Sequence, residues 1–152
     1  METTRHESVL LTEAIEGLAI VQDDVVVDAT LGGAGHFSSI LSLLGSEGVL
    51  VGIDADHDAV VRGREAASKA VAQVHVMEGN FRDLDTMLDE LKIETITKAL
   101  FDLGWSSFHL SAGRGFSFKV NEPLHMTYGT PQKGKTAADL LNTASEEAIR
   151  DM

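Results

Sequence analysis

A glycine-rich turn between a predicted strand and a predicted helix carries the strongest chemical signal in the sequence. In the segment VVVDATLGGAGH, residues 25–36, a run of β-branched residues ends at Asp28, and Gly32, Gly33 and Gly35 follow it. Glycine permits backbone angles that other residues avoid, and it lets a ligand approach the main chain. The N–H groups at the start of the following helix favour a carboxylate or a phosphate. The turn therefore predicts a ligand site, although a glycine turn without a ligand remains an alternative.

A carboxylate follows at the spacing expected for ribose recognition. Asp54 ends the next β-rich run, VLVGID, 19 residues after Gly35, and an acidic residue at such a strand end usually accepts hydrogen bonds from ribose hydroxyls. The dinucleotide fingerprint G-x-G-x-x-G is absent, because the turn reads GGAGH. Asp28 would also repel a diphosphate, whereas it would attract an ammonium group. S-adenosylmethionine fits these residues better than NAD, and an NAD-binding module stays as the less favoured alternative.

Two later strand ends face the same predicted crevice. Phe81, in the segment GNF, follows the third β-rich run and could pack either on an adenine or in the core. Asp102 ends the fourth run, at the carboxyl edge where ligands of open α/β sheets bind. Beyond it, Trp105, Phe108 and Phe116 are candidates for stacking on a nucleobase or for local packing. The chain has no cysteine and its histidines do not pair at ligand spacings, so no metal site is expected.

These residues require a parallel sheet to position them. Short runs rich in β-branched residues alternate with helical patterns over the first two thirds of the chain, which predicts an α/β fold with the strand order 3-2-1-4. Strands are predicted at 25–28, 49–54, 73–77 and 96–102, and helices at 7–18, 36–44, 56–70 and 83–92. A glycine- and proline-containing stretch follows, with helices predicted at 136–141 and after Ser145.

Composition and charge restrict the class of protein. The 152 residues are 43% hydrophobic and 24% charged, which is globular composition. No apolar run reaches the roughly 20 residues of a membrane helix, and no signal peptide is visible, so a cytoplasmic protein is expected. The net charge of −12 lies within residues 1–102, while residues 103–138 carry +3 through four basic residues, Arg114, Lys119, Lys133 and Lys135, against one acidic residue. These four are candidates for contacts with phosphates, or they lie on a solvated loop.

The chain resembles a known enzyme family. The motifs HESVLLTEAIEGL, VDATLGGAGH, GID, GNF, DLGWSS, GRGFSF, EPLHM and TAADLLNTASEE occur in this order. Together they are similar to those of the bacterial methyltransferases that modify the N4 amine of a cytidine in small-subunit ribosomal RNA, the RsmH/MraW family. The resemblance implies a Rossmann-like class I S-adenosylmethionine-dependent methyltransferase domain, interrupted by a helical insertion that helps hold RNA.

The resemblance also implies a division of the chain. Residues 1–105 would be the first part of the methyltransferase domain, and residues 106–152 would begin the inserted RNA-binding subdomain. The C-terminal half would be missing, in keeping with a fourth strand that leaves an apolar edge. A non-catalytic remnant that binds cofactor or RNA is therefore a second interpretation. The substrate would be small-subunit ribosomal RNA or the assembled 30S particle, with the oligomeric state open.

Site residues follow from the resemblance position by position. The family's cofactor contacts fall on seven residues, namely Ala34, Gly35, His36, Asp54, Phe81, Asp102 and His109. No catalytic residue is assigned, although Asp102 is a candidate for accepting a hydrogen bond from the target amine. The chain departs from the family pattern at several positions, with alanine for glycine at Ala34, a larger residue at Trp105, phenylalanine for proline at Phe108, and His125 and Thr127 where aspartate and arginine are common.

Overall fold

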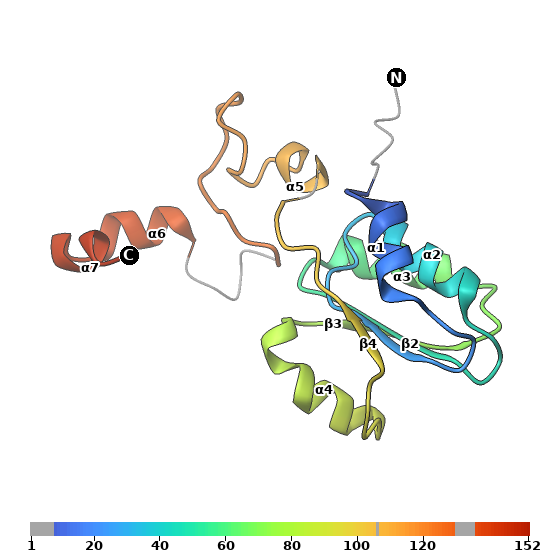
Figure 1. Cartoon of the computed structure of the whole chain (residues 1–152). Helices are drawn as coiled ribbons and strands as arrows, with labels where there is room; N and C mark the ends of the chain where they lie inside the picture. The colour runs from blue at the N-terminus through green and yellow to red at the C-terminus, as the bar shows by residue number, and fades with distance from the viewer. Residues whose placement is uncertain (1–7, 106, 130–135) are drawn as a thin grey trace. The chain divides into compact units, whose positions relative to one another are not determined.

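The computed structural model describes residues 8–105, 107–129 and 136–152 (Figure 1). The chain divides into two compact units, Met1–Gly104 and Trp105–Met152, and each is described by itself. Lys133 and Lys135, two of the four residues of the predicted basic stretch, lie outside the described residues.

A four-stranded parallel sheet forms the centre of the first unit. Its strands are β1 Val25–Asp28, β2 Val49–Asp54, β3 Gln73–Glu78 and β4 Lys98–Leu100. Their order is β3-β2-β1-β4, as the sequence predicted. The register pairs Asp28 with Gly52 and with Leu100, and pairs Asp54 with Glu78. The carboxyl ends of all four strands therefore meet at one edge of the sheet.

Helices cover both faces of this sheet (Figure 1). The helices α1 Leu11–Leu18, α2 Gly35–Leu43 and α3 His57–Ala67 lie on one face, and α4 Leu84–Leu91 lies on the other. A 3-10 turn, Phe81–Asp83, leads into α4. The predicted helices exist at their expected places, with ends that differ by one to four residues, because helix ends depend on local capping rather than on periodicity.

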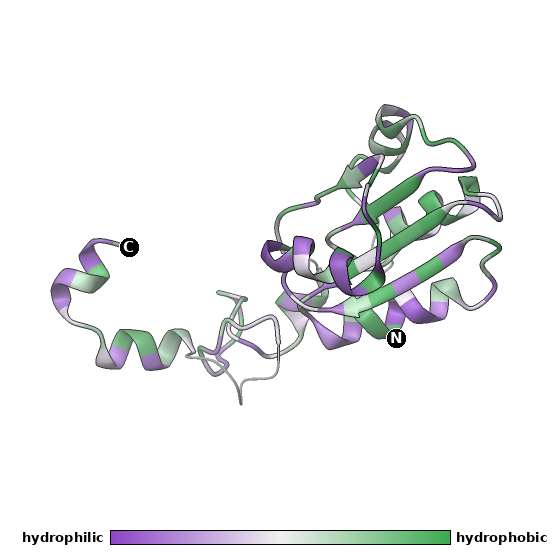
Figure 2. Ribbon diagram, turned by 90° about the horizontal axis from the view of Figure 1, so that it is seen from below, coloured by the Kyte–Doolittle hydropathy of each residue, from purple (hydrophilic) through white to green (hydrophobic). Residues whose placement is uncertain are grey.

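Alternation along β1 and β2 divides the core into two layers. Val26 and Leu50 face α2 and α3, where they pack with Phe37 and Val60. Their neighbours Val27 and Val51 face the opposite side, which α4 covers. Figure 2 shows the hydrophobic colouring concentrated along these strands. The fold thus places two largely buried strands next to the glycine turn.

The outer strands differ from the prediction of full burial. β3 and β4 are only half-buried, because each has a pairing partner on one side alone among the described residues. β4 also spans three residues rather than the predicted seven. The Thr97 hydroxyl donates to the Val25 carbonyl, and the Asp102 N–H donates to the Thr30 hydroxyl. Backbone hydrogen bonds from the Thr97 N–H to the Val25 carbonyl and from the Ala29 N–H to the Leu100 carbonyl are also present, so the side-chain bonds add to the backbone pairing at both ends of the strand.

The described residues of the second unit form three short helices, α5 Ser107–Ser111, α6 Ala137–Thr143 and α7 Glu146–Arg150. A capping box formed by Thr136 and Asp139 starts α6. The Ser145 side chain accepts a hydrogen bond from the Ala148 N–H, which confirms the predicted start of α7. The backbone of Leu124 and His125 accepts hydrogen bonds from the first residues of α6 and so attaches this helix to the preceding loop.

Candidate functional site

The glycine turn folds as a tight connection between β1 and α2. The Leu31 N–H donates to the Ile53 carbonyl over 3.1 Å, and the Ala34 N–H donates to the Leu31 carbonyl over 2.6 Å. Gly32 and Ala34 both have left-handed backbone angles, with φ of 48° and 61°. This conformation costs alanine roughly 1 kcal/mol more than it costs glycine. The turn therefore keeps its shape at Ala34 at a small energetic cost.

Asp54 fixes the turn from the neighbouring strand. Its Oδ2 accepts the Gly32 N–H over 2.8 Å, and its Oδ1 accepts the Asp56 N–H over 2.9 Å. The Arg62 Nε, on α3, donates to the Gly32 carbonyl over 2.9 Å. Both backbone polar groups of Gly32, the N–H and the carbonyl, are therefore hydrogen-bonded. A carboxylate accepts about four hydrogen bonds, which leaves Asp54 with acceptor capacity for ribose hydroxyls.

Asp28 is the most unusual group at this edge of the sheet. Its side chain is fully buried, its Oδ1 accepts the Thr30 N–H over 3.1 Å, and its Oδ2 has no partner. Burial raises the pKa of Asp28 to about 7; the charges of Asp54 and Asp102 add to the rise, and the Thr30 N–H opposes it. A buried, unpartnered carboxylate oxygen is suited to a cationic ligand group and would repel a diphosphate.

His36 joins two parts of the first unit. Its ring is buried, and Nε2 donates to the Val9 carbonyl over 3.1 Å. Nδ1 lies 3.7 Å from Oδ2 of Asp102, whose side chain is 44% exposed. The side chain of His36 therefore connects the start of α1 with the end of β4. If His36 contacts a ligand at the turn, it does so through its backbone N–H, which lies in the first turn of α2.

Phe81 lies at the carboxyl end of β3 with an exposed ring. The ring is 39% exposed and meets Phe101 edge to face, with centroids 5.6 Å apart. Packing in the core, the alternative left open by the sequence, is therefore wrong. The ring remains available for an adenine face.

The structure brings together six of the seven predicted contacts, at the carboxyl edge of the sheet; these are Ala34, Gly35, His36, Asp54, Phe81 and Asp102. The seventh, His109, belongs to the second unit, where its buried ring lies against Phe116 and Tyr128. Its role toward a ligand stays a prediction. Sequence reasoning missed Arg62 altogether, because nothing in a helical pattern indicates which side chain will reach a carbonyl 30 residues earlier.

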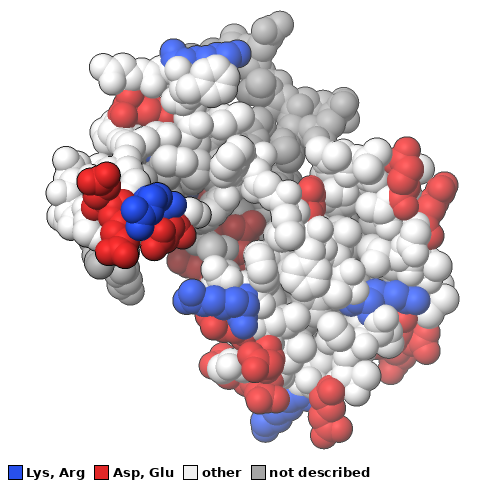
Figure 3. Space-filling view, turned by 60° about the vertical axis from the view of Figure 1, so that its left-hand side comes forward, with Lys and Arg blue, Asp and Glu red and all other residues white. Residues whose placement is uncertain are grey.

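Surface charge, possible metal ligands and helix length add three findings on the described residues. Acidic side chains gather in several groups on the face shown in Figure 3, and the basic ones there are few. No cluster of histidine and acidic residues in the described part of the chain is arranged to hold a metal ion. Among those same residues, no helix has the length and apolar character that crossing a membrane requires.

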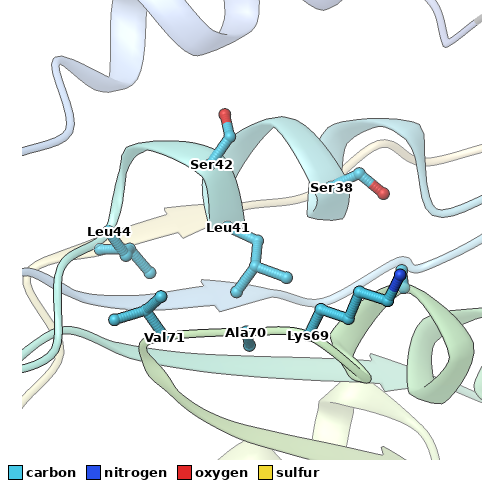
Figure 4. A pocket seen from close by; sticks show the side chains of 8 residues that line it. Ser38, Leu41, Ser42, Leu44, Lys69, Ala70 and Val71 are labelled. Carbon is cyan, nitrogen blue, oxygen red and sulfur yellow. The ribbon is translucent and has the colours of Figure 1, made fainter.

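A separate cavity of about 330 Å³ lies away from the glycine turn. It is formed by the second half of α2 and the segment after α3, and Leu41, Leu44 and Val71 point toward one another in it (Figure 4). The predicted ligand contacts on α2 are at the opposite end of that helix, at Gly35 and His36. The cavity is therefore not part of the candidate site.

The strand order, the glycine turn after β1 and the aspartate that ends β2 define a Rossmann-like class I methyltransferase fold. A solved structure from Clostridium thermocellum, of a candidate rRNA methylase, has the same fold with a TM-score of 0.57 and 20% identity. That likeness covers 66% of this chain and 54% of the other.

The chain belongs to the MraW methylase family, whose family model matches residues 3–152. It is 43% identical over 149 residues to ribosomal RNA small subunit methyltransferase H of Dictyoglomus thermophilum, covering 97% of this chain and 50% of that protein. It is 41% identical over 152 residues to the protein of the same name from Neisseria gonorrhoeae, covering 99% and 47%. The chain spans about half the length of these relatives.

Proposed function

We propose that the chain is the N-terminal part of an enzyme that transfers a methyl group from S-adenosylmethionine to the N4 amine of a cytidine in small-subunit ribosomal RNA. The negative charge at the carboxyl edge of the sheet, where Asp54 and Asp102 lie near the buried Asp28, is the observation that carries the choice of cofactor. S-adenosylmethionine has an ammonium and a sulfonium that gain from such charge, whereas the diphosphate of NAD does not. The cytoplasm, where ribosomal subunits are present, is the proposed location.

Each predicted contact has a proposed part in holding this cofactor. Asp54 accepts hydrogen bonds from the ribose hydroxyls, and the backbone at Ala34, Gly35 and His36 faces the methionine portion. Phe81 packs on the adenine, since its ring is exposed beside that strand end. His109 completes the family's set of contacts by resemblance alone.

The chemistry requires little from the protein beyond placement. Bound S-adenosylmethionine supplies an electrophilic methyl group on sulfur. The cytosine amine is a weak nucleophile because its lone pair is conjugated with the ring. The Asp102 carboxylate is partly exposed, and the backbone N–H of the same residue donates to the Thr30 hydroxyl. This carboxylate accepts a hydrogen bond from the amine and favours a tetrahedral nitrogen. The same carboxylate can then take up the proton that the methylated amine releases.

The second part of the proposal concerns the RNA. Residues 106–152 form the beginning of an inserted helical subdomain that helps bind the small-subunit RNA or the assembled 30S particle. The positive charge of residues 103–138 supports this assignment, because the rest of the chain is strongly acidic.

A methyl-transfer assay on small ribosomal subunits tests the proposed function. The donor carries a labelled methyl group, and the protein is compared with a version completed to the length of its relatives. We expect the completed protein to place the label on N4 of a cytidine. Label on another atom, or no transfer at all, would contradict the proposal. The 152-residue chain, assayed in parallel, distinguishes an active part from a non-catalytic binding remnant.

A further inference from the structure

An aromatic cluster organises the loop region of the second unit. It consists of Trp105, His109, Phe116 and Tyr128. The His109 ring is buried and meets Tyr128 edge to face, with centroids 4.9 Å apart. Phe116 lies 5.5 Å from Tyr128 and 6.4 Å from Trp105. Phe116 therefore links Trp105 to the rings of His109 and Tyr128.

The backbone around the inner rings is firmly held. Gly115 has a φ of 85°, and a Cβ there would lie 2.6 Å from the Pro123 carbonyl. Oε1 of Glu122 accepts the N–H groups of Gly115 and Ser117, on either side of Phe116. The Arg114 Nη1 donates to the Tyr128 carbonyl over 2.7 Å. Phe116 and Tyr128 thus come from segments that are fixed to each other.

Trp105 differs from the other members of the cluster because 64% of it is exposed. A large apolar ring left in water beside a firmly held ring is typical of a binding surface. Unpaired nucleobases stack on such rings, and each stacked base contributes about 1–3 kcal/mol. The surrounding unit also holds Arg114 and Lys119 within the stretch of positive charge. This combination suits a nucleic acid better than an apolar protein surface.

The overall charge increases the importance of base contacts. The chain carries a net −12, so its long-range field repels RNA. Phosphate contacts by a few basic residues yield a modest, salt-dependent attraction. A short-range contact that salt does not screen must then supply a substantial share of the affinity.

We propose that Trp105, supported by Phe116, is the platform on which an unpaired base of the RNA substrate stacks. This inference rests on the proposed function, because it takes RNA as the substrate. It also separates the roles of the aromatic residues, since Phe116 supports the platform and Trp105 contacts the base.

Intrinsic fluorescence gives a direct test, because Trp105 is the single tryptophan of the chain. We expect a short single-stranded, cytidine-rich RNA to quench its emission to saturation, and a double-stranded RNA of equal length to leave it nearly unchanged. In anisotropy measurements with labelled single-stranded RNA, Trp105→Leu should weaken binding about 5- to 150-fold. Trp105→Phe, which keeps an aromatic face, should recover most of the affinity.

Salt dependence separates stacking from charge. Trp105→Leu should leave the slope of log affinity against log salt unchanged, while Lys119→Gln should reduce it by up to about one unit. The matched control is Phe118→Leu, a substitution at an aromatic residue of the same loop that is 95% exposed, and it should bind RNA as the original chain does.

Three results would overturn the inference. If Trp105→Leu binds RNA as tightly as the original chain, the stacking platform is rejected, but the proposal that RNA is the substrate is not. A blue shift of the emission that grows with protein concentration, without RNA, would show that a second copy covers Trp105. No RNA binding at all would reject both the platform and the RNA substrate, and a parallel titration with S-adenosylmethionine would show whether the cofactor site survives.

Discussion

At the scale of single residues, Asp28 connects the stability of the fold to the chemistry of the site. Its pKa is raised to about 7 from an ordinary value of 3.8, chiefly by burial. Between these two values the folded state binds more protons than the unfolded state, so the free energy of unfolding falls as the pH rises from about 4 to about 7. Above pH 7 and without a bound cation, the buried carboxylate is charged, and the contribution of the protonated Asp28 to the free energy of unfolding is lost.

Asp28→Asn should remove this pH dependence, because an amide does not titrate. From pH 4 to pH 8, the unfolding free energy of the original chain should fall by roughly 4 kcal/mol relative to that of the variant. Urea titrations at several pH values measure it. Asp89→Asn, at an exposed carboxylate on α4, is the control and should show no comparable trend. A difference for Asp28→Asn that is flat with pH would show that Asp28 is not protonated on folding.

Arg62 is a positioning residue for the glycine turn. Its Nε donates to the Gly32 carbonyl, and the Gly32 N–H donates to the Asp54 carboxylate. Arg62→Met should therefore lower the affinity for S-adenosylmethionine about five- to tenfold and the unfolding free energy by about 1 kcal/mol. Calorimetric titration and urea unfolding measure the two effects. Arg64→Met, at an exposed position of the same helix, should change neither; equal effects at both positions would remove the special role of Arg62.

At the scale of elements, the close packing of α2 on β2 sets where the turn lies. Gly52 has no side chain, and a Cβ there would lie 2.6 Å from both Leu31 and Phe37. Phe37 is fully buried in α2, so a larger residue in β2 would push the helix away from the sheet. The position of the α2 N-terminus thus depends on a glycine in the neighbouring strand.

Gly52→Ala should lower the unfolding free energy by about 1–3 kcal/mol, because the buried side chains of Leu31 and Phe37 have no free space to move into. Gly17→Ala provides a control of opposite sign. Gly17 lies in α1 with nothing near its Cβ position, and alanine should stabilise the helix there by about 0.5–1 kcal/mol. Thermal and urea unfolding of both variants check the pair. A neutral Gly52→Ala would mean that α2 can move without cost.

The same elements show how far the sequence alone can predict the structure. The bounds of β1 and β2 were predicted correctly, because buried parallel strands are continuous β-branched runs. The prediction for β4 was too long, because the length of this strand is set by its pairing with the short β1, and a residue pattern does not show such long-range pairing. Asp54 was predicted at its strand end, whereas the unpartnered oxygen of Asp28 became visible only with the packing around it.

At the scale of the whole molecule, the chain combines the candidate site at the glycine turn with an open sheet edge. The described part of the sheet ends at β4, and Phe101 and Leu103 beyond it are exposed. The relatives are about twice as long as this chain. The proposed cofactor contacts that belong to β2 and to the start of α2 lie in the first unit. The chain should therefore bind S-adenosylmethionine as it stands.

Calorimetric titration with S-adenosylmethionine tests this claim most directly. The chain should bind one equivalent of S-adenosylmethionine, and NAD should bind more weakly. Asp54→Ala should weaken the binding of S-adenosylmethionine at least about tenfold, since hydrogen bonds to a charged group are lost; circular dichroism confirms that the variant folds. Affinity that is unchanged in Asp54→Ala, or NAD bound more tightly than S-adenosylmethionine, would contradict a methyl-donor site at the glycine turn.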